Sequence, residues 1–290
     1  MRFAYLIMAH HRFDVLKLLL SDLDDARNDI YLHIDSESEA DIDSIKACVT
    51  VSRLVCIRRR RVYWGDVSQI ECVIDLLKAA VSDGYHDYYH FLAGVELPVP
   101  SQDAIHRFFE AHQGKEFIGF DTANGPEKYL DRVMYRHYFR KYERRYNRYT
   151  KRLLLLGERL LARQIQKGKN RIRGHEDYYR KGDAKWSVTH DLALHFIARY
   201  PEMKPVYRWS YCGDELFFQT EVYHSRFYEN VYDKEDEFAS SMRYAVWTGQ
   251  GRLTMQDVDT LIQSGRLFAR KFESEDAAEI FARLRERRSA

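Results

Sequence analysis

The sequence predicts an α/β protein in which helices cover both faces of a mostly parallel, Rossmann-like sheet. The first hundred residues alternate short apolar runs with amphipathic stretches, which is the pattern of parallel strands joined by helical crossovers. Hydrophobic residues make up 45% of the chain and charged residues 31%, as in an ordinary globular protein. With 290 residues, the chain is long enough to bury a large core.

Hydrophobic spacing predicts each element in turn. In the first half, strands are expected at residues 3–9, 30–34, 51–57 and 88–92, and helices at 15–23, 40–47 and 68–81, the last capped by Ser68. Further along, we expect helices at 102–112, 192–200, 215–223, 254–264 (capped by Thr254) and 276–287, and strands at 117–120 and 184–188. The turn-rich segment AGVELPVPS follows the strand at 88–92, at the edge where open α/β sheets bind ligands.

The sequence argues against several classes of protein. No apolar run approaches the roughly 18 residues that a membrane-spanning helix needs, and no export signal is expected. Four scattered cysteines without a CxxC pattern predict reduced thiols in a cytoplasmic protein. The motifs typical of nucleoside triphosphatases, dinucleotide dehydrogenases, serine hydrolases and zinc proteases are absent.

One basic segment dominates the charge pattern. Residues 136–173 contain fourteen Lys and Arg against Glu143 and Glu158, an excess of twelve positive charges in a chain of net charge +2, so the remaining residues carry a net −10. On a helix, its apolar side chains would face inward or into lipid while its cations meet solvent or anionic headgroups. These side chains are Leu153, Leu156, Leu160 and Ile165, with Arg152, Arg159 and Arg163.

The interleaved Arg and Tyr of residues 135–173 also allow a different function. Aromatic rings can stack on bases while cations follow phosphates, so single-stranded nucleic acid is the alternative partner. The acidic remainder of the chain and the lack of an RNA-binding signature disfavour it, so no nucleic acid is expected.

Candidate catalytic groups lie near the C-terminus. The three Asp-x-Asp pairs, at 22–24, 41–43 and 257–259, fall in or beside predicted helices, so no metal site is expected there. Arg243, Arg270 and Lys271 have the charge and shape to bind a diphosphate, or are ordinary surface charges. Asp214 and Glu215 open a predicted helix, either as caps or with one of them as a general base.

Eight segments, taken in order, carry a family resemblance. They are YLIMAHH, IYLHIDSES, VYWGDVSQIECVIDLL, YYHFLAGVELPVPS, GDAKWSVTHDLA, CGDELFFQT, MRYAVW and LFARKFE. The chain resembles the Core-2/I-branching enzyme family of glycosyltransferases, which includes β-1,6-N-acetylglucosaminyltransferases and peptide O-xylosyltransferases. The resemblance implies a GT-A-type fold and inverting chemistry that uses no metal or other cofactor.

The resemblance also assigns roles to residues. Glu215 corresponds to the catalytic base of the family. The cations that bind the diphosphate correspond to Arg243 and Lys271, with Arg270 beside them. Asp35 corresponds to an aspartate near the uridine. Here CGDE replaces the more usual Pro-Asp-Glu. Further residues are expected to contact donor sugar or acceptor: Trp64, Glu96 (where the family usually has Asp), Arg132, Trp186 and Asp214. Trp64 and Trp186 either stack on a sugar or fill the core.

The resemblance implies a single catalytic domain over residues 1–290. Residues 1–115 would bind the nucleotide, 116–230 the acceptor, with the basic insertion at about 130–174, and 231–290 the diphosphate, ending in the tail helix. The expected donor is UDP-xylose or UDP-N-acetylglucosamine, and the expected acceptor is a glycan or lipid-linked glycan of bacterial polysaccharide synthesis. We expect a cytoplasmic protein in peripheral contact with the inner face of an anionic membrane.

Overall fold

Alternating side chains of the first strand divide the core into two layers. In β1 (Phe3–Ala9), Phe3, Tyr5 and Ile7 belong to one buried apolar cluster, and Ala4 and Leu6 to the other. Because successive side chains of a strand point to opposite faces, a strand with both faces buried is apolar throughout. The computed structural model describes residues 1–144, 147–246 and 251–289.

The central sheet has six strands in the order β3-β2-β1-β4-β7-β6. Strand β7 is antiparallel to both of its neighbours, and the pairs among β1 to β4 are parallel. A smaller sheet, in the order β5-β9-β8, joins the loop after β4 to the C-terminal segment. Besides β1, the strands are β2 (Asn28–Ile34), β3 (Arg53–Cys56), β4 (Tyr88–Ala93), β5 (Leu97–Pro98), β6 (Phe117–Ile118), β7 (Trp186–Thr189), β8 (Arg243–Ala245) and β9 (Phe268–Arg270).

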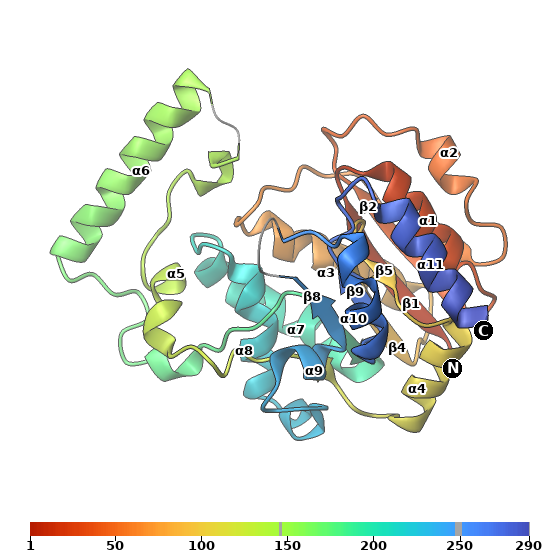
Figure 1. The fold of residues 1–290 in the computed structure, drawn as a ribbon. Coiled ribbons are helices and arrows are strands. Elements are labelled where there is room, and N and C mark those ends of the chain that lie inside the picture. Colours follow the sequence, from red (N-terminus) through yellow and green to blue (C-terminus); the bar gives the residue numbers. More distant parts are fainter. Residues whose placement is uncertain (145–146, 247–250, 290) are drawn as a thin grey trace.

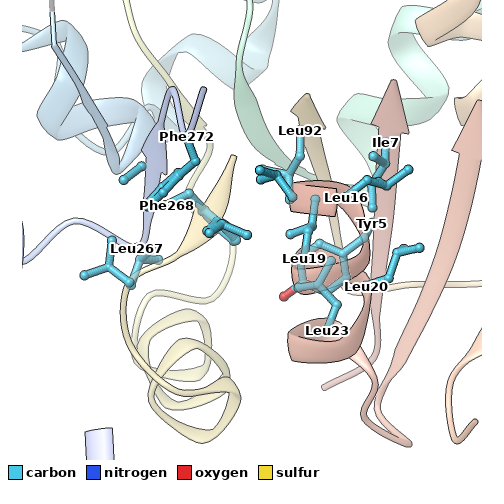
Figure 2. Close-up of a cluster of buried hydrophobic side chains, with 14 of the residues drawn as sticks. Tyr5, Ile7, Leu16, Leu19, Leu20, Leu23, Leu92, Leu267, Phe268 and Phe272 are labelled. Atoms are coloured by element: carbon cyan, nitrogen blue, oxygen red, sulfur yellow. The ribbon is translucent and has the colours of Figure 1, made fainter. Parts of the chain in front are cut away.

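Helices cover both faces of the large sheet (Figure 1). On one face α1 (Phe13–Leu23) and α4 (Gln102–Ala111) share a cluster with α10 (Val258–Gln263), α11 (Ala277–Ser289) and β9. Figure 2 shows part of this cluster, in which Leu16 and Leu19 of α1 lie near Tyr5. The Phe268 ring meets the Tyr5 ring edge-on, with the ring centres 6.3 Å apart. On the other face lie α3 (Ser68–Ser82), α7 (His190–Tyr207) and α8 (Phe217–Tyr223). The predicted α/β class, with a mostly parallel sheet between helices, is confirmed.

The remaining helices lie at the periphery. They are α2 (Ile42–Lys46), α5 (Asp131–Met134), α6 (Arg148–Gln166) and α9 (Glu237–Ser241). Helix α6 stands away from the sheet and its covering helices (Figure 1). Of its predicted apolar set, Leu153 and Leu160 are partly buried, whereas Leu156 and Ile165 are 43% and 53% exposed. Among the described residues, no helix combines the length and apolarity needed to cross a bilayer.

Three local predictions were wrong. Ser68 is the first residue of α3 and not its cap; its hydroxyl accepts from the Tyr63 N–H at 2.9 Å. Helix α7 runs past Pro201 to Tyr207, because Tyr200 and Tyr207 on either side of the prolines are buried in the core. The predicted helix at 215–223 begins only at Phe217, after a 3₁₀ turn at Gly213–Glu215. The predicted cap Thr254 forms a capping box with Asp257, at the start of a 3₁₀ turn (Met255–Asp257) that leads into α10.

Candidate active site

The site lies where the parallel strands end. Glu96 follows β4, Asp35 follows β2, and Lys185 directly precedes the antiparallel strand β7, so all three reach the same edge of the sheet. Arg270 comes to this edge because β9 pairs with β5 just after Glu96. Open α/β sheets bind ligands at this edge.

Glu215 lies on the 3₁₀ turn beside Arg132. Its Oε2 is 2.6 Å from Arg132 Nη1, and the side chains of Glu215 and Arg132 are 35% and 22% exposed. Neither this turn nor α8 has a side-chain cap, so the capping role left open for Asp214 and Glu215 is not realised. Glu215 is therefore an ion-paired carboxylate that solvent and a ligand can reach.

The loop at Trp64 and Gly65 holds this turn in place. The Cys212 N–H donates to the Gly65 carbonyl at 2.9 Å, and Gly65 has a positive φ of +69°. A Cβ at Gly65 would lie 3.0 Å from the Tyr211 ring, so the close approach of the two segments requires glycine. Trp64 is 39% exposed and meets the edge of Tyr211, with the Arg144 guanidinium 4.2 Å above its own ring. The structure thus places Trp64 beside the Glu215 turn.

Asp214 is buried beneath Glu215. Its Oδ2 accepts from Gln69 Nε2 at 3.3 Å, and the residue is 9% exposed. Burial, together with the negative charge of Glu215, raises the pKa of Asp214 to about 7. Near neutral pH, Asp214 therefore exists in both protonation states, directly next to the candidate base.

The Asp214 carboxyl should make stability fall as pH rises. Because its folded-state pKa exceeds the ordinary value of 3.8, the folded chain holds this proton more tightly than the unfolded chain between about pH 4 and pH 7. Stability is thus lost across this window, and Asp214→Asn should reduce that loss. Urea unfolding at pH 5 and pH 7.5 measures it, with Asp43→Asn on exposed α2 as the control. Equal pH dependence in the Asp214 variant and the parent would contradict this assignment.

A second charged cluster adjoins the turn. Arg270 Nη1 is 2.9 Å from Asp183 Oδ1, and its Nε is 3.7 Å from Glu96 Oε1. Glu96 is fully buried, and neither of its carboxylate oxygens has a hydrogen-bond partner among the described residues. Burial raises the pKa of Glu96. A buried carboxylate without hydrogen bonds is costly, and the charge of Arg270 beside Glu96 offsets part of that cost.

Lys185 connects the two groups of charges. Its Nζ lies 3.8 Å from the centre of the Phe91 ring, and burial lowers its pKa, partly offset by Glu96, Asp183 and Asp214. Sequence reasoning singled out the block GDAKW but assigned no role to Asp183 or Lys185. The signal was present, since a lysine directly before a buried strand of a sheet is unusual unless a carboxylate accompanies it.

Arg243, which was predicted to bind the diphosphate, lies inside the core. The residue is fully buried, and its guanidinium donates to the Ser241 carbonyl at 2.7 Å and to the Trp186 carbonyl and Ser187 Oγ, each at 3.1 Å. The ring of Phe268 lies 4.4 Å from its guanidinium carbon. Burial lowers the pKa of Arg243 to about 10. In this structure the hydrogen-bonding groups of Arg243 are directed at the core, so its contribution to diphosphate binding stays a prediction.

Trp186 is also a core residue. It is fully buried and packs against Phe91, Phe196 and Phe218 at ring distances of 5.3–5.6 Å. In this structure Trp186 fills the core, which is the second of the two roles expected for it. The reason is the register of β7, which points Trp186 into the layer beneath α7 and α8.

Asp35 and Lys271 each directly follow a strand, β2 and β9 respectively. The Asp35 carboxylate accepts from the Val62 N–H at 2.7 Å and the Glu37 N–H at 2.9 Å, which ties the end of β2 to the loop before α3. Lys271 directly follows β9 and is partly exposed. Trp247 of the MRYAVW segment lies outside the described residues. No group of three His, Cys, Asp or Glu poised to hold a metal occurs in the described part of the chain.

The site combines an accessible carboxylate with neighbouring cations, and it lies at the carboxyl edge of an α/β sheet. Such a site is suited to transferring a group from a phosphate-bearing donor. The model of the Core-2/I-branching enzyme family matches residues 3–264. The chain belongs to this family and is a glycosyltransferase.

Individual proteins resemble this chain much less closely than the family model does. A search of curated proteins finds no match. Among solved structures, the apo form of mouse xyloside xylosyltransferase 1 aligns with a TM-score of 0.38 and 11% sequence identity, over 78% of this chain and 83% of that one.

Proposed function

We propose that the protein is an inverting, metal-independent transferase that moves xylose or N-acetylglucosamine from a UDP-sugar to a hydroxyl group of a glycan or lipid-linked glycan. The observation that carries this proposal is the Glu215 carboxylate, held by Arg132 within reach of solvent beside the Arg270 cluster. The expected setting is bacterial polysaccharide synthesis, on the cytoplasmic side of an anionic membrane that the protein contacts peripherally.

The residues divide the reaction between them. Glu215 takes the proton of the acceptor hydroxyl, whose oxygen bonds to the anomeric carbon as the bond from that carbon to UDP breaks. Arg270 and Lys271, with Lys185 nearby, stabilise the negative charge of the departing diphosphate. Arg132 positions Glu215, Asp35 lies at the expected uridine end, and Trp64 offers an exposed ring to a sugar.

Donor hydrolysis tests this proposal without knowledge of the acceptor. UDP release from UDP-xylose, UDP-N-acetylglucosamine, UDP-glucose and UDP-galactose should be measured in chelator, with UDP affinity by calorimetry. We expect UDP to bind without metal, and one of the first two donors to be hydrolysed preferentially. A requirement for manganese would refute the metal-independent mechanism, and failure to bind any UDP-sugar would refute the donor class.

A further inference from the structure

A pocket of about 660 Å³ lies at the C-terminal end of α6 and is lined mainly by cations. It is formed by the last turns of α6, the segment that follows, and residues 136–138. Its cations are Arg136, Arg163, Lys167, Lys169, Arg171 and Arg173. None of the six forms an ion pair with a carboxylate of the described residues. Two acids of this part of the chain are engaged elsewhere: Glu158 pairs with Arg140, and Glu176 accepts from Asn170 and from the Gly174 N–H.

Hydrogen bonds hold the walls of this pocket together. The Gln164 side chain accepts from the Arg136 N–H and donates to the Arg136 carbonyl, each at 3.0 Å. Arg171 donates to the carbonyls of Tyr135 and Val206, and burial together with the charge of Arg136 lowers its pKa. Carbonyl oxygens orient a guanidinium but do not neutralise it. The walls therefore hold like charges together, and a bound anion would relieve their repulsion.

One face of α6 continues into this pocket. Side chains three or four positions apart share a face of a helix, and such a stripe runs along α6 to the residue after it. The stripe consists of Tyr149, Arg152, Leu156, Leu160, Arg163 and Lys167. Tyr149 is 76% exposed and Leu156 is 43% exposed. The helix itself stands away from the sheet (Figure 1).

We propose that the pocket binds the phosphate of an anionic lipid headgroup while the Tyr149 and Leu156 side of α6 lies in the surface of the bilayer. Guanidinium groups match phosphate geometry, and each Lys or Arg near an anionic bilayer strengthens binding about fivefold. Free phosphate would account for the cations but not for the exposed Tyr149 and Leu156, which an interfacial helix buries. Stacked bases need rings along the groove, whereas Leu156 and Leu160 occupy the middle of the stripe.

This site would also orient the active site toward the membrane. Before α6, two arginines contact the Glu215 turn and the Trp64 loop beside it: the Arg140 guanidinium lies 5.2 Å from the Tyr211 ring, and Arg144 covers Trp64. An acceptor anchored in the bilayer would then be presented near Glu215. The inference rests on the proposed membrane contact, and not on the roles assigned to catalytic residues.

Sedimentation with vesicles tests the proposal on the full chain. Vesicles of phosphatidylglycerol in phosphatidylcholine should bind the protein, and vesicles of phosphatidylcholine alone should not. Arg163→Gln with Lys167→Gln should weaken binding about 25-fold, at about fivefold per cation. The matched control is Lys78→Gln with Arg107→Gln, which removes the same charge from exposed positions of α3 and α4 and should change affinity less than twofold. Tyr149→Ser with Leu156→Ser should abolish the part of the binding that resists salt.

Several outcomes would overturn the proposal. These are equal binding to both vesicle types, an equal loss in the control pair, tighter binding of a single-stranded oligonucleotide than of vesicles, or saturation by inorganic phosphate with no gain from a bilayer. UDP affinity should be unchanged in every variant, because none of them touches the catalytic cluster. Loss of vesicle binding with UDP binding intact would therefore separate this site from the proposed chemistry.

Discussion

Glu215→Gln is expected to reduce glycosyl transfer by about 10²–10⁴-fold, the usual contribution of a general base, while UDP affinity stays unchanged. Glutamine keeps the shape of the side chain but cannot take the proton of the acceptor hydroxyl. The variant should remain folded, because a partly exposed ion pair such as Glu215 with Arg132 contributes at most about 1 kcal/mol to stability. Transfer rates at saturating donor, with UDP calorimetry on the same samples, provide the measurement.

Two further variants make this result specific. Glu279→Gln makes the same chemical change at an exposed position of α11 and should leave turnover unchanged. Arg132→Lys keeps a cation beside Glu215 but loses the fixed geometry of the guanidinium, so it should retain far more activity than Glu215→Gln. Normal turnover in a folded Glu215→Gln protein would remove Glu215 from the mechanism.

The sequence predicted the order of elements well because burial determines composition on both faces of the sheet. The run FAYLIMA has the same bounds in the structure as in the prediction, since every position of β1 meets one of two apolar layers. Helix ends were predicted less well. The Ser68 hydroxyl binds the Tyr63 N–H of the preceding loop instead of capping α3. The continuation of α7 beyond Pro201 depends on contacts outside the helix, such as the packing of Tyr207 against Phe217.

The sequence predicted which residue types form the candidate site, but it did not predict which of these residues are buried. Glu215 and Arg132 come together as an ion pair although 83 positions separate them, and each had been selected for its own segment. Arg243 was assigned to the diphosphate through the family resemblance, and Trp186 was expected either to stack on a sugar or to fill the core. Their burial follows from the pairing of β8 with β9 and from the register of β7, neither of which is encoded locally.

Arg243→Ala should destabilise the fold by about 3–5 kcal/mol, the usual cost of removing one partner from a buried charged network. The substitution removes the donors that satisfy the Trp186 carbonyl and Ser187 Oγ, and it removes a positive charge that offsets the buried Glu96. Chemical unfolding of the variant against the parent measures the loss. If the alanine variant does not fold, Arg243→Lys keeps the charge and tests the lost hydrogen bonds alone.

Lys271→Ala should weaken UDP binding and leave the stability of the fold nearly unchanged. Comparing it with Arg243→Ala therefore distinguishes a residue that binds the ligand from one that stabilises the fold. Lys271 is partly exposed, so its loss should change stability by no more than about 0.5 kcal/mol. UDP affinity should fall about 10-fold to 100-fold, because a hydrogen bond to a charged group contributes about 1.5–3 kcal/mol. If Arg243→Ala were as stable as the parent and bound UDP more weakly, Arg243 would face the diphosphate as the family resemblance implies. Loss of stability in that variant, with weakened UDP binding confined to Lys271→Ala, would place the cationic contact at the end of β9.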